Sequence, residues 1–212
     1  MSTAPADGIA LGYEPADDAP RREERIWIPA GGCHVVPAVS AALKAALLSA
    51  VLDFRPRRDA RVVVLGAELE ALDARARAAV RAQVAFLPAG GGLISHLNAW
   101  ENIALPLSYH APRQMQGVAP RVYALLEPFA GDVRALLAKL PEEMSPFEKM
   151  LAGYARMMLG APRLVLAEAP PRSLGPAERR QAEEFGAAYL ARCPQGTFVR
   201  LEDGHDEAGE AG

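Results

Sequence analysis

The sequence predicts an α/β fold in which a parallel sheet is interrupted by a helical segment. Two observations carry this prediction. Short apolar runs rich in β-branched residues alternate with helical patterns, and residues 98–160 contain no convincing strand. The apolar runs suit a sheet covered on both faces, and they are Cys33–Val36, Arg61–Leu65, Val84–Leu87, Leu164–Ala167 and Thr197–Leu201.

Helical patterns follow these runs at 39–52, 73–81, 146–159 and 177–192. The last one begins after Gly175 with Pro176 in its first turn and Glu178 beside the positive end of the helix dipole, which is typical of a helix start. Prolines at 106, 112 and 120 divide the helical segment. We expect residues 1–25 to form a loose arm and residues 202–212 an acidic tail, because neither shows apolar periodicity.

Composition limits the classes of function. The chain has 212 residues, of which 50% are hydrophobic and 23% charged, which is typical of one globular domain. Its formal net charge of -3 gives no basic face for nucleic acid. Only Cys33 and Cys193 are cysteines, so a disulfide framework is not expected and a reducing compartment fits. The N-terminal residues do not have the pattern of a secretion signal.

Several segments, in order and at matching spacing, resemble an ATP-binding-cassette (ABC) ATPase over residues 26–201. Ile26–Gly32 corresponds to the glycine turn before the phosphate loop, Ala38–Ala45 to the phosphate loop (Walker A) and Arg61–Gly66 to the second strand. Phe86–Leu107 corresponds to the Q-loop with its following helix, and Leu140–Arg156 to the signature helix. Pro162–Pro170 corresponds to Walker B and Ser173–Pro176 to the D-loop. Leu47-Leu48 and Arg55-Pro56 also fall where the family has a leucine pair and a proline turn. The resemblance implies a P-loop NTPase-like ABC ATPase core with an inserted helical subdomain at about 98–160.

The segment Trp100–Leu107 points to one group within the ABC ATPases. Its pattern Trp-Glu-Asn-Ile-Ala-Leu-Pro-Leu is similar to the ATP-binding subunits of Mla-type (MCE-associated) phospholipid transporters. The resemblance therefore implies a subunit that lies in the cytoplasm, peripheral to the inner membrane, and works with a membrane permease.

The phosphate-loop segment has lost the residues that bind phosphate. Such a loop needs glycines that let backbone N–H groups surround phosphate, a lysine, and a hydroxyl for Mg²⁺. Here Ala38 and Leu43 stand at the glycine positions, Ala45 stands at the hydroxyl position, and Lys44 alone remains. The alternative for Lys44 is a partly solvated lysine on a core helix.

The other nucleotide motifs are also altered. The Q-loop glutamine corresponds to Ala89, the D-loop aspartate to Gly175, and the catalytic glutamate after Walker B to Ala169. The signature motif is Met144-Ser145-Pro146-Phe147-Glu148, in which Phe147 would place a ring where phosphate should lie, while Ser145 and Pro146 still begin a helix. The switch histidine falls near Glu202 or Asp203, and His205 fits a tail residue better.

These losses lead to predictions about ligands. Lys44 and Glu168 are the only nucleotide-binding candidates, and both are vestigial; Glu168 is equally compatible with a solvated acid after a strand. We expect no catalytic residue, no metal site and no cofactor, with ATP and Mg²⁺ bound only if residual function survives. The histidines show no metal-ligand spacing: they are His34, His96, His110 and His205.

The segment after the Q-loop, by contrast, keeps the family pattern. In the family this region faces the coupling helix of the membrane subunit, so we predict a partner-binding face that contains Leu97, Trp100, Asn102 and Pro106. Trp100 is an amphipathic aromatic of the kind that anchors interfaces. The alternative is a cluster at a helix start that closes the core of the subdomain itself.

The predicted function is a catalytically degenerate ABC subunit that docks on, or regulates, a lipid-transport permease. A residual ATP-binding or ATPase subunit is one alternative, and a protein-binding scaffold unrelated to transport is another. The implied partners are a membrane permease subunit and an ABC ATPase subunit, the latter in a homodimer or a heterodimer.

Overall fold

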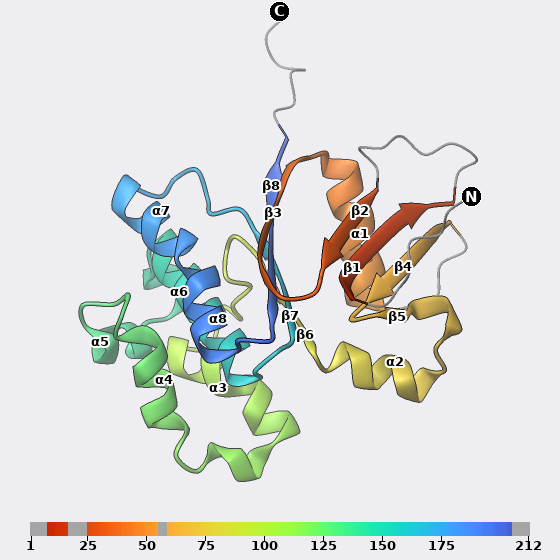
Figure 1. Ribbon diagram of the computed structural model, residues 1–212. Helices are drawn as coiled ribbons and strands as arrows, with labels where there is room; N and C mark the ends of the chain where they lie inside the picture. Colours follow the sequence, from red (N-terminus) through yellow and green to blue (C-terminus); the bar gives the residue numbers. More distant parts are fainter. Residues whose placement is uncertain (1–7, 17–24, 55–58, 205–212) are drawn as a thin grey trace, which may run out of the picture.

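The computed structural model describes residues 8–16, 25–54 and 59–204. Within these residues the chain forms two four-stranded sheets, and Figure 1 shows them side by side. In the antiparallel sheet the order is β2-β1-β4-β5, with β1 Ile9–Pro15, β2 Ile26–Pro29, β4 Ala60–Val64 and β5 Ala67–Glu68. In the parallel sheet the order is β3-β8-β7-β6, with β3 Gly32–Val39, β6 Val84–Leu87, β7 Leu164–Glu168 and β8 Thr197–Asp203.

The helices lie on both sides of the parallel sheet. On one side are α1 (Ala41–Asp53) and, beside the antiparallel sheet, α2 (Ala74–Arg81). The other side carries the helical segment and the last two helices (Figure 1): α3 Ala99–His110, α4 Val118–Leu126, α5 Val133–Ala138, α6 Pro146–Leu159, α7 Pro176–Glu183 and α8 Phe185–Arg192. Short 3-10 turns lie at Leu69–Ala71, Pro112–Met115 and Pro141–Glu143.

Strand β7 explains why the apolar runs predicted a covered sheet. Leu164 and Leu166 are fully buried in a core formed with α1 and the antiparallel sheet. Their neighbours Val165 and Ala167 are buried in a second core formed with the helical segment. Successive side chains of a strand point to opposite faces, so both faces of β7 are buried.

The helix starts follow the local chemistry of the sequence. Ser145 caps α6: its Oγ accepts from the Glu148 N–H at 3.1 Å, and its own N–H donates to Glu148 Oε2 at 2.8 Å. This capping box, with Pro146 in the first turn, confirms the predicted start. Gly175 and Pro176 likewise begin α7, although the predicted helix 177–192 is divided at Glu184.

The N-terminal segment is more ordered than predicted. Part of the expected loose arm is β1, which lies between β2 and β4 and buries Ala10, Leu11 and Tyr13. Gly12 lies in the middle of this strand, paired with Trp27 and Val63, and an added Cβ there would lie 2.5 Å from the Trp27 ring. Its stability depends on that long-range pairing, which periodicity does not reveal.

The structure corrects two further predictions. The run Arg61–Leu65 forms β4 of the antiparallel sheet rather than a strand of the parallel one. Strand β8 continues to Asp203, so the expected acidic tail begins as a strand. Residues 205–212 of that tail, residues 1–7 and 17–24 of the N-terminal arm, and Arg55-Pro56 lie outside the described residues. Among the described helices, none has the length and apolarity needed to cross a bilayer.

Candidate functional site

The connection from β2 to β3 leads into the site. Gly31 and Gly32 have φ of 85° and 81°, a left-handed conformation that favours glycine, and they turn the chain from the antiparallel sheet into the parallel one. The Gly31 N–H donates to Thr197 Oγ1 at 2.8 Å, which fixes the start of β3 beside β8. This is the glycine turn expected for Ile26–Gly32, with β2 paired to β1.

Strand β3 passes into α1 almost directly. Strand β3 ends at Val39 and α1 begins at Ala41, so Ser40 alone separates them. Ser40 is extended (φ −62°, ψ 150°), and its Oγ accepts from the Leu43 N–H at 3.2 Å. The segment that resembles a phosphate loop is therefore a strand, a capped helix start and a helix.

Lys44 lies one turn into α1 and contacts two acids. Its Nζ is 3.0 Å from Glu168 Oε1 and 2.9 Å from Asp203 Oδ1. Partial burial lowers the pKa of Lys44, but the bonds to Asp203 and Glu168 outweigh it, so the pKa lies above its ordinary value. The structure thus brings together the two predicted nucleotide-binding residues, Lys44 and Glu168, and adds Asp203. Sequence reasoning placed Asp203 near the switch position but gave it no role.

Glu168 connects this cluster to the Q-loop position. It ends β7, and its second oxygen, Oε2, accepts from the Ala89 N–H at 2.9 Å. Ala89 follows the neighbouring strand β6, whose pairing with β7 places both positions at one edge of the sheet. Glu168 is therefore held between a lysine and a backbone donor and is not merely solvated.

A pocket opens where these elements meet. Its volume is about 360 Å³, and its lining residues are Ala41, Lys44, Ala45, Leu48, Glu168, Asp203 and Gly204. The pocket lies against the first turns of α1, where the helix dipole favours negative charge. An anionic group next to Lys44, with a metal ion held by Glu168, is the kind of ligand that this arrangement can accept.

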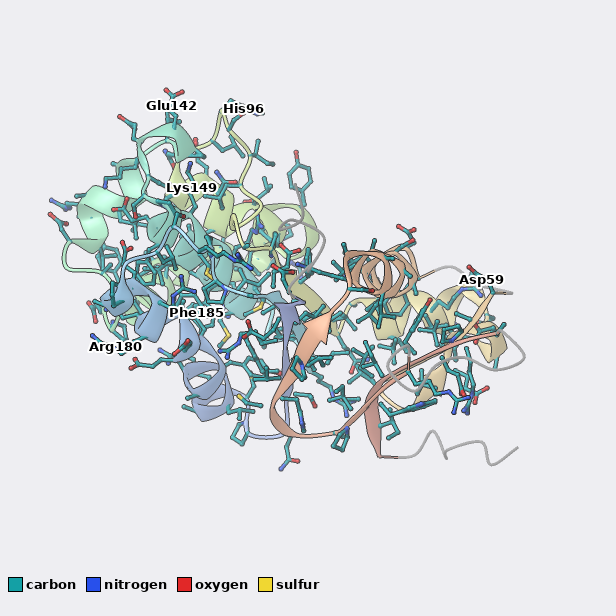
Figure 2. All side chains as sticks on the ribbon, turned by 90° about the horizontal axis from the view of Figure 1, so that it is seen from above. Asp59, His96, Glu142, Lys149, Arg180 and Phe185 are labelled. Atoms are coloured by element: carbon teal, nitrogen blue, oxygen red, sulfur yellow. The ribbon has the colours of Figure 1, made fainter. Side chains whose placement is uncertain are left out.

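The signature segment does not place a ring at the phosphate position. Phe147 is 5% exposed and belongs to the core of the helical side. Its ring centroid lies 6.2 Å from that of Phe185, which Figure 2 labels among the helices. The prediction for Phe147 is wrong because burial of an aromatic ring on the inner face of α6 is more favourable than exposure at a surface.

The predicted partner-binding segment begins with a loop that Asn102 holds together. The Asn102 amide donates to the carbonyls of Ile94, Leu97 and Asn98, and its Oδ1 accepts from the Ile94 N–H at 2.7 Å. Asn102 is fully buried. It is therefore not available to a partner, and its expected place on a binding face is corrected to a structural role inside the loop.

The remaining predicted residues lie at the edge of the core. Leu97, Trp100 and Pro106 are half-buried, and Trp100 packs against the helical core. The exposed apolar side chains of this region are Ile94, 36% exposed, and Tyr109, 78% exposed, both of which sequence reasoning passed over. Figure 2 shows the exposed His96 of the same loop at the end of the molecule that also carries Glu142 and Lys149.

The fold is that of ABC ATPases. CbiO1 of Clostridium perfringens, part of the CbiONQ ABC transporter complex, superposes with a TM-score of 0.71 over 93% of this chain and 80% of its own, at 11% identity. An ATP-binding cassette solved as a dimer with ADP and Pi superposes with a TM-score of 0.64 over 92% of this chain and 88% of its own, at 16% identity. These structures define the class of fold, a P-loop NTPase-like ABC core.

Sequence comparison points in the same direction. The methionine import ATP-binding protein of Cupriavidus necator is 29% identical over 164 residues, 77% of this chain and 47% of that protein. The Fe(3+) ions import ATP-binding protein of Pseudomonas fluorescens is 28% identical over 83% of this chain and 48% of its length. The lipoprotein-releasing system ATP-binding protein of Shewanella denitrificans is 29% identical over 61% of this chain and 58% of its length. No protein-family model matches the chain.

The chain spans about half the length of the first two relatives, and all three are ATP-binding proteins of transport systems by name. The prediction that no cofactor is bound is therefore wrong: the relatives are ATP-binding proteins, and a neighbour of the same fold holds ADP and Pi. In this chain the pocket beside Lys44 combines a cation, a helix N-terminus and, in Glu168, an acid that can hold a metal ion.

Proposed function

We propose that this protein is an ABC-type nucleotide-binding subunit that binds ATP beside Lys44, hydrolyses it slowly or not at all, and docks on a membrane permease from the cytoplasmic side. The observation that carries the proposal is the position of Lys44. In a chain with the ABC fold, it lies on the helix that follows the first parallel strand and faces the acid that ends β7.

Binding and hydrolysis make different demands on the site. Lys44 and the start of α1 supply positive potential for phosphate, and Glu168 can hold a metal ion. Hydrolysis also needs a group that orients the attacking water. The residue that follows Glu168 is Ala169, whose methyl group can neither accept nor donate a proton. Binding without rapid turnover is what these residues support.

Docking is assigned to the surface formed by the 92–97 loop and α3. Ile94 of the loop and Tyr109 near the end of α3 are exposed, and Leu97, Trp100 and Pro106 of the same segment are half-buried. Asn102 fixes the loop that presents Ile94. A rigid loop loses little conformational entropy on binding, which favours it as a docking element.

The partner we propose is the membrane subunit of a lipid transporter, together with a second ABC subunit, either a copy of this chain or a homologue. The resemblance of Trp100–Leu107 to Mla-type subunits supports the lipid. The similarity to a lipoprotein-releasing ATP-binding protein is compatible with it, whereas other relatives are named for methionine or iron import.

The experiment is affinity purification of the tagged full chain from solubilised membranes of its own host. We expect a multi-pass membrane protein to co-purify with the natural chain and to be lost with Ile94→Asp, because a charge at an apolar contact is costly to desolvate. Ala187→Asp, on the exposed surface of α8, is the matched control and should retain the complex. Equal recovery with both variants would contradict docking through this loop.

A further inference from the structure

We propose that Asp203 competes with nucleotide for Lys44. Its carboxylate contacts the ammonium group that the phosphate end of the ligand must also contact, and it thereby sets the affinity of the site for nucleotide. This inference rests on the proposed ATP binding beside Lys44. It adds a residue from the last strand to that site and assigns it a regulatory role.

The contact geometry shows the competition. Asp203 Oδ1 lies 2.9 Å from Lys44 Nζ, and Glu168 Oε1 lies 3.0 Å from the same nitrogen. All three residues line the same pocket. An ammonium has three donors. Two of these donors point at carboxylates inside the pocket. A phosphate can accept from one of these two donors only if the acid that holds it moves.

Asp203 is the acid that can move. Glu168 has a second anchor in the Ala89 N–H, and its side chain is only 22% exposed. The Asp203 side chain is 59% exposed and lies at the end of β8. Moving Asp203 into solvent breaks its contact with Lys44, whereas moving Glu168 breaks its contact with Lys44 and its hydrogen bond from Ala89.

The charges of the cluster also favour Asp203 as the competing acid. Lys44, Glu168 and Asp203 together carry one positive and two negative charges, so the cluster repels a polyphosphate despite its lysine. Without the Asp203 charge the lysine is matched by Glu168 alone, and the dipole of α1 then favours an anion. A ligand that arrives with its own Mg²⁺ is repelled less, because the cation offsets part of the phosphate charge.

The test measures Mg-ATP binding to the full chain by isothermal titration calorimetry and by thermal shift. We expect Asp203→Asn to bind Mg-ATP about two- to fivefold more tightly than the natural chain, because an exposed ion pair contributes up to about 1 kcal/mol. The matched control is Glu202→Gln, which removes the same charge one residue away, where the carboxylate pairs with Arg200 at 2.5 Å. It should leave the affinity unchanged.

The outcomes separate the inference from the function on which it rests. If Asp203→Asn and Glu202→Gln bind Mg-ATP as the natural chain does, Asp203 is not a competitor, while ATP binding stands. Equal tightening by both variants also overturns the inference, because it would reflect net charge. If no form binds Mg-ATP at millimolar concentration, the proposed function and the inference fail together. If Lys44→Ala removes the difference in Mg-ATP affinity that Asp203→Asn makes, the gain acts through Lys44, which supports the inference.

Discussion

At the scale of single residues, the candidate site combines an ion pair with a neighbouring position that has no polar side chain. Lys44 and Glu168 meet at 3.0 Å across the edge of the parallel sheet. Ala169, the next residue, donates its N–H to the Leu201 carbonyl at 3.0 Å and brings no side chain that can activate water. Ala169 therefore places no carboxylate beside Glu168, and the lining of the pocket includes the carboxylates of Glu168 and Asp203.

Restoring that one carboxylate should not restore turnover. We expect Ala169→Glu to show no ATPase activity above that of the Lys44→Ala, Ala169→Glu double variant, because Pro146 and Phe147 replace the signature glycines and Phe147 is buried. Phosphate release at saturating Mg-ATP measures this, with Ala169→Gln as the isosteric control. Lysine-dependent turnover in the single variant would show that the remaining motifs still act.

At the scale of elements, the loop before the predicted docking surface is fastened to helix α6 by two glycines and an arginine. Gly91 has φ 73°, and a Cβ at Gly153 of α6 would lie 2.5 Å from the Gly91 carbonyl oxygen. The Arg156 guanidinium donates to the carbonyls of Gly91 and Gly92, each at 2.8 Å. This contact couples the loop that exposes Ile94 to the helix that carries the signature segment.

Adding a methyl group at this contact should loosen it. We expect Gly153→Ala to lower the free energy of unfolding by about 1–3 kcal/mol, because overpacking pushes apart two backbones that cannot both stay in place. Urea unfolding measures the loss. Gly131→Ala is the control, since a Cβ there meets nothing within 4 Å. An unchanged Gly153→Ala stability would mean that the loop and α6 can separate without cost.

At the scale of the whole molecule, the parallel sheet joins two cores. Leu166 and Val165 are adjacent in β7 but are buried in different cores, one with α1 and the antiparallel sheet, the other with the helical segment. Figure 1 shows that the sheet lies between these two sides. A change in one core must therefore reach the other through a shared strand.

The two tryptophans allow the coupling between the two cores to be measured. Trp27 lies in the antiparallel sheet and Trp100 packs against the helical core. We expect Leu166→Ala to cost about 2–5 kcal/mol and to shift the unfolding midpoint reported by each tryptophan equally, when measured in Trp27→Phe and Trp100→Phe backgrounds. Tyr109→Ala, at an exposed position, should shift neither. Separate midpoints for the two tryptophans would show that the sides unfold independently.

The sequence by itself determined the local features of this protein. Apolar runs predicted five strands, all of which the structure contains, and the helix starts at Ser145 and Gly175 follow from side chains within a few residues. Such features depend on short-range steric and hydrogen-bonding preferences, so one segment is enough to predict them. The similarity to ABC ATPases also followed from short motifs, and both the fold and the relatives support it.

Only the tertiary structure decided the contacts between distant segments. Strand β1 is ordered because β2 and β4 pair with it. Asn102 is buried because the preceding loop folds around its amide, and Phe147 turns inward because the rings of α6 and α8 pack together. Asp203 reaches Lys44 across 159 residues of sequence. The parallel pairing of β3 with β8 creates that contact, because it brings the last strand alongside the strand that leads into α1.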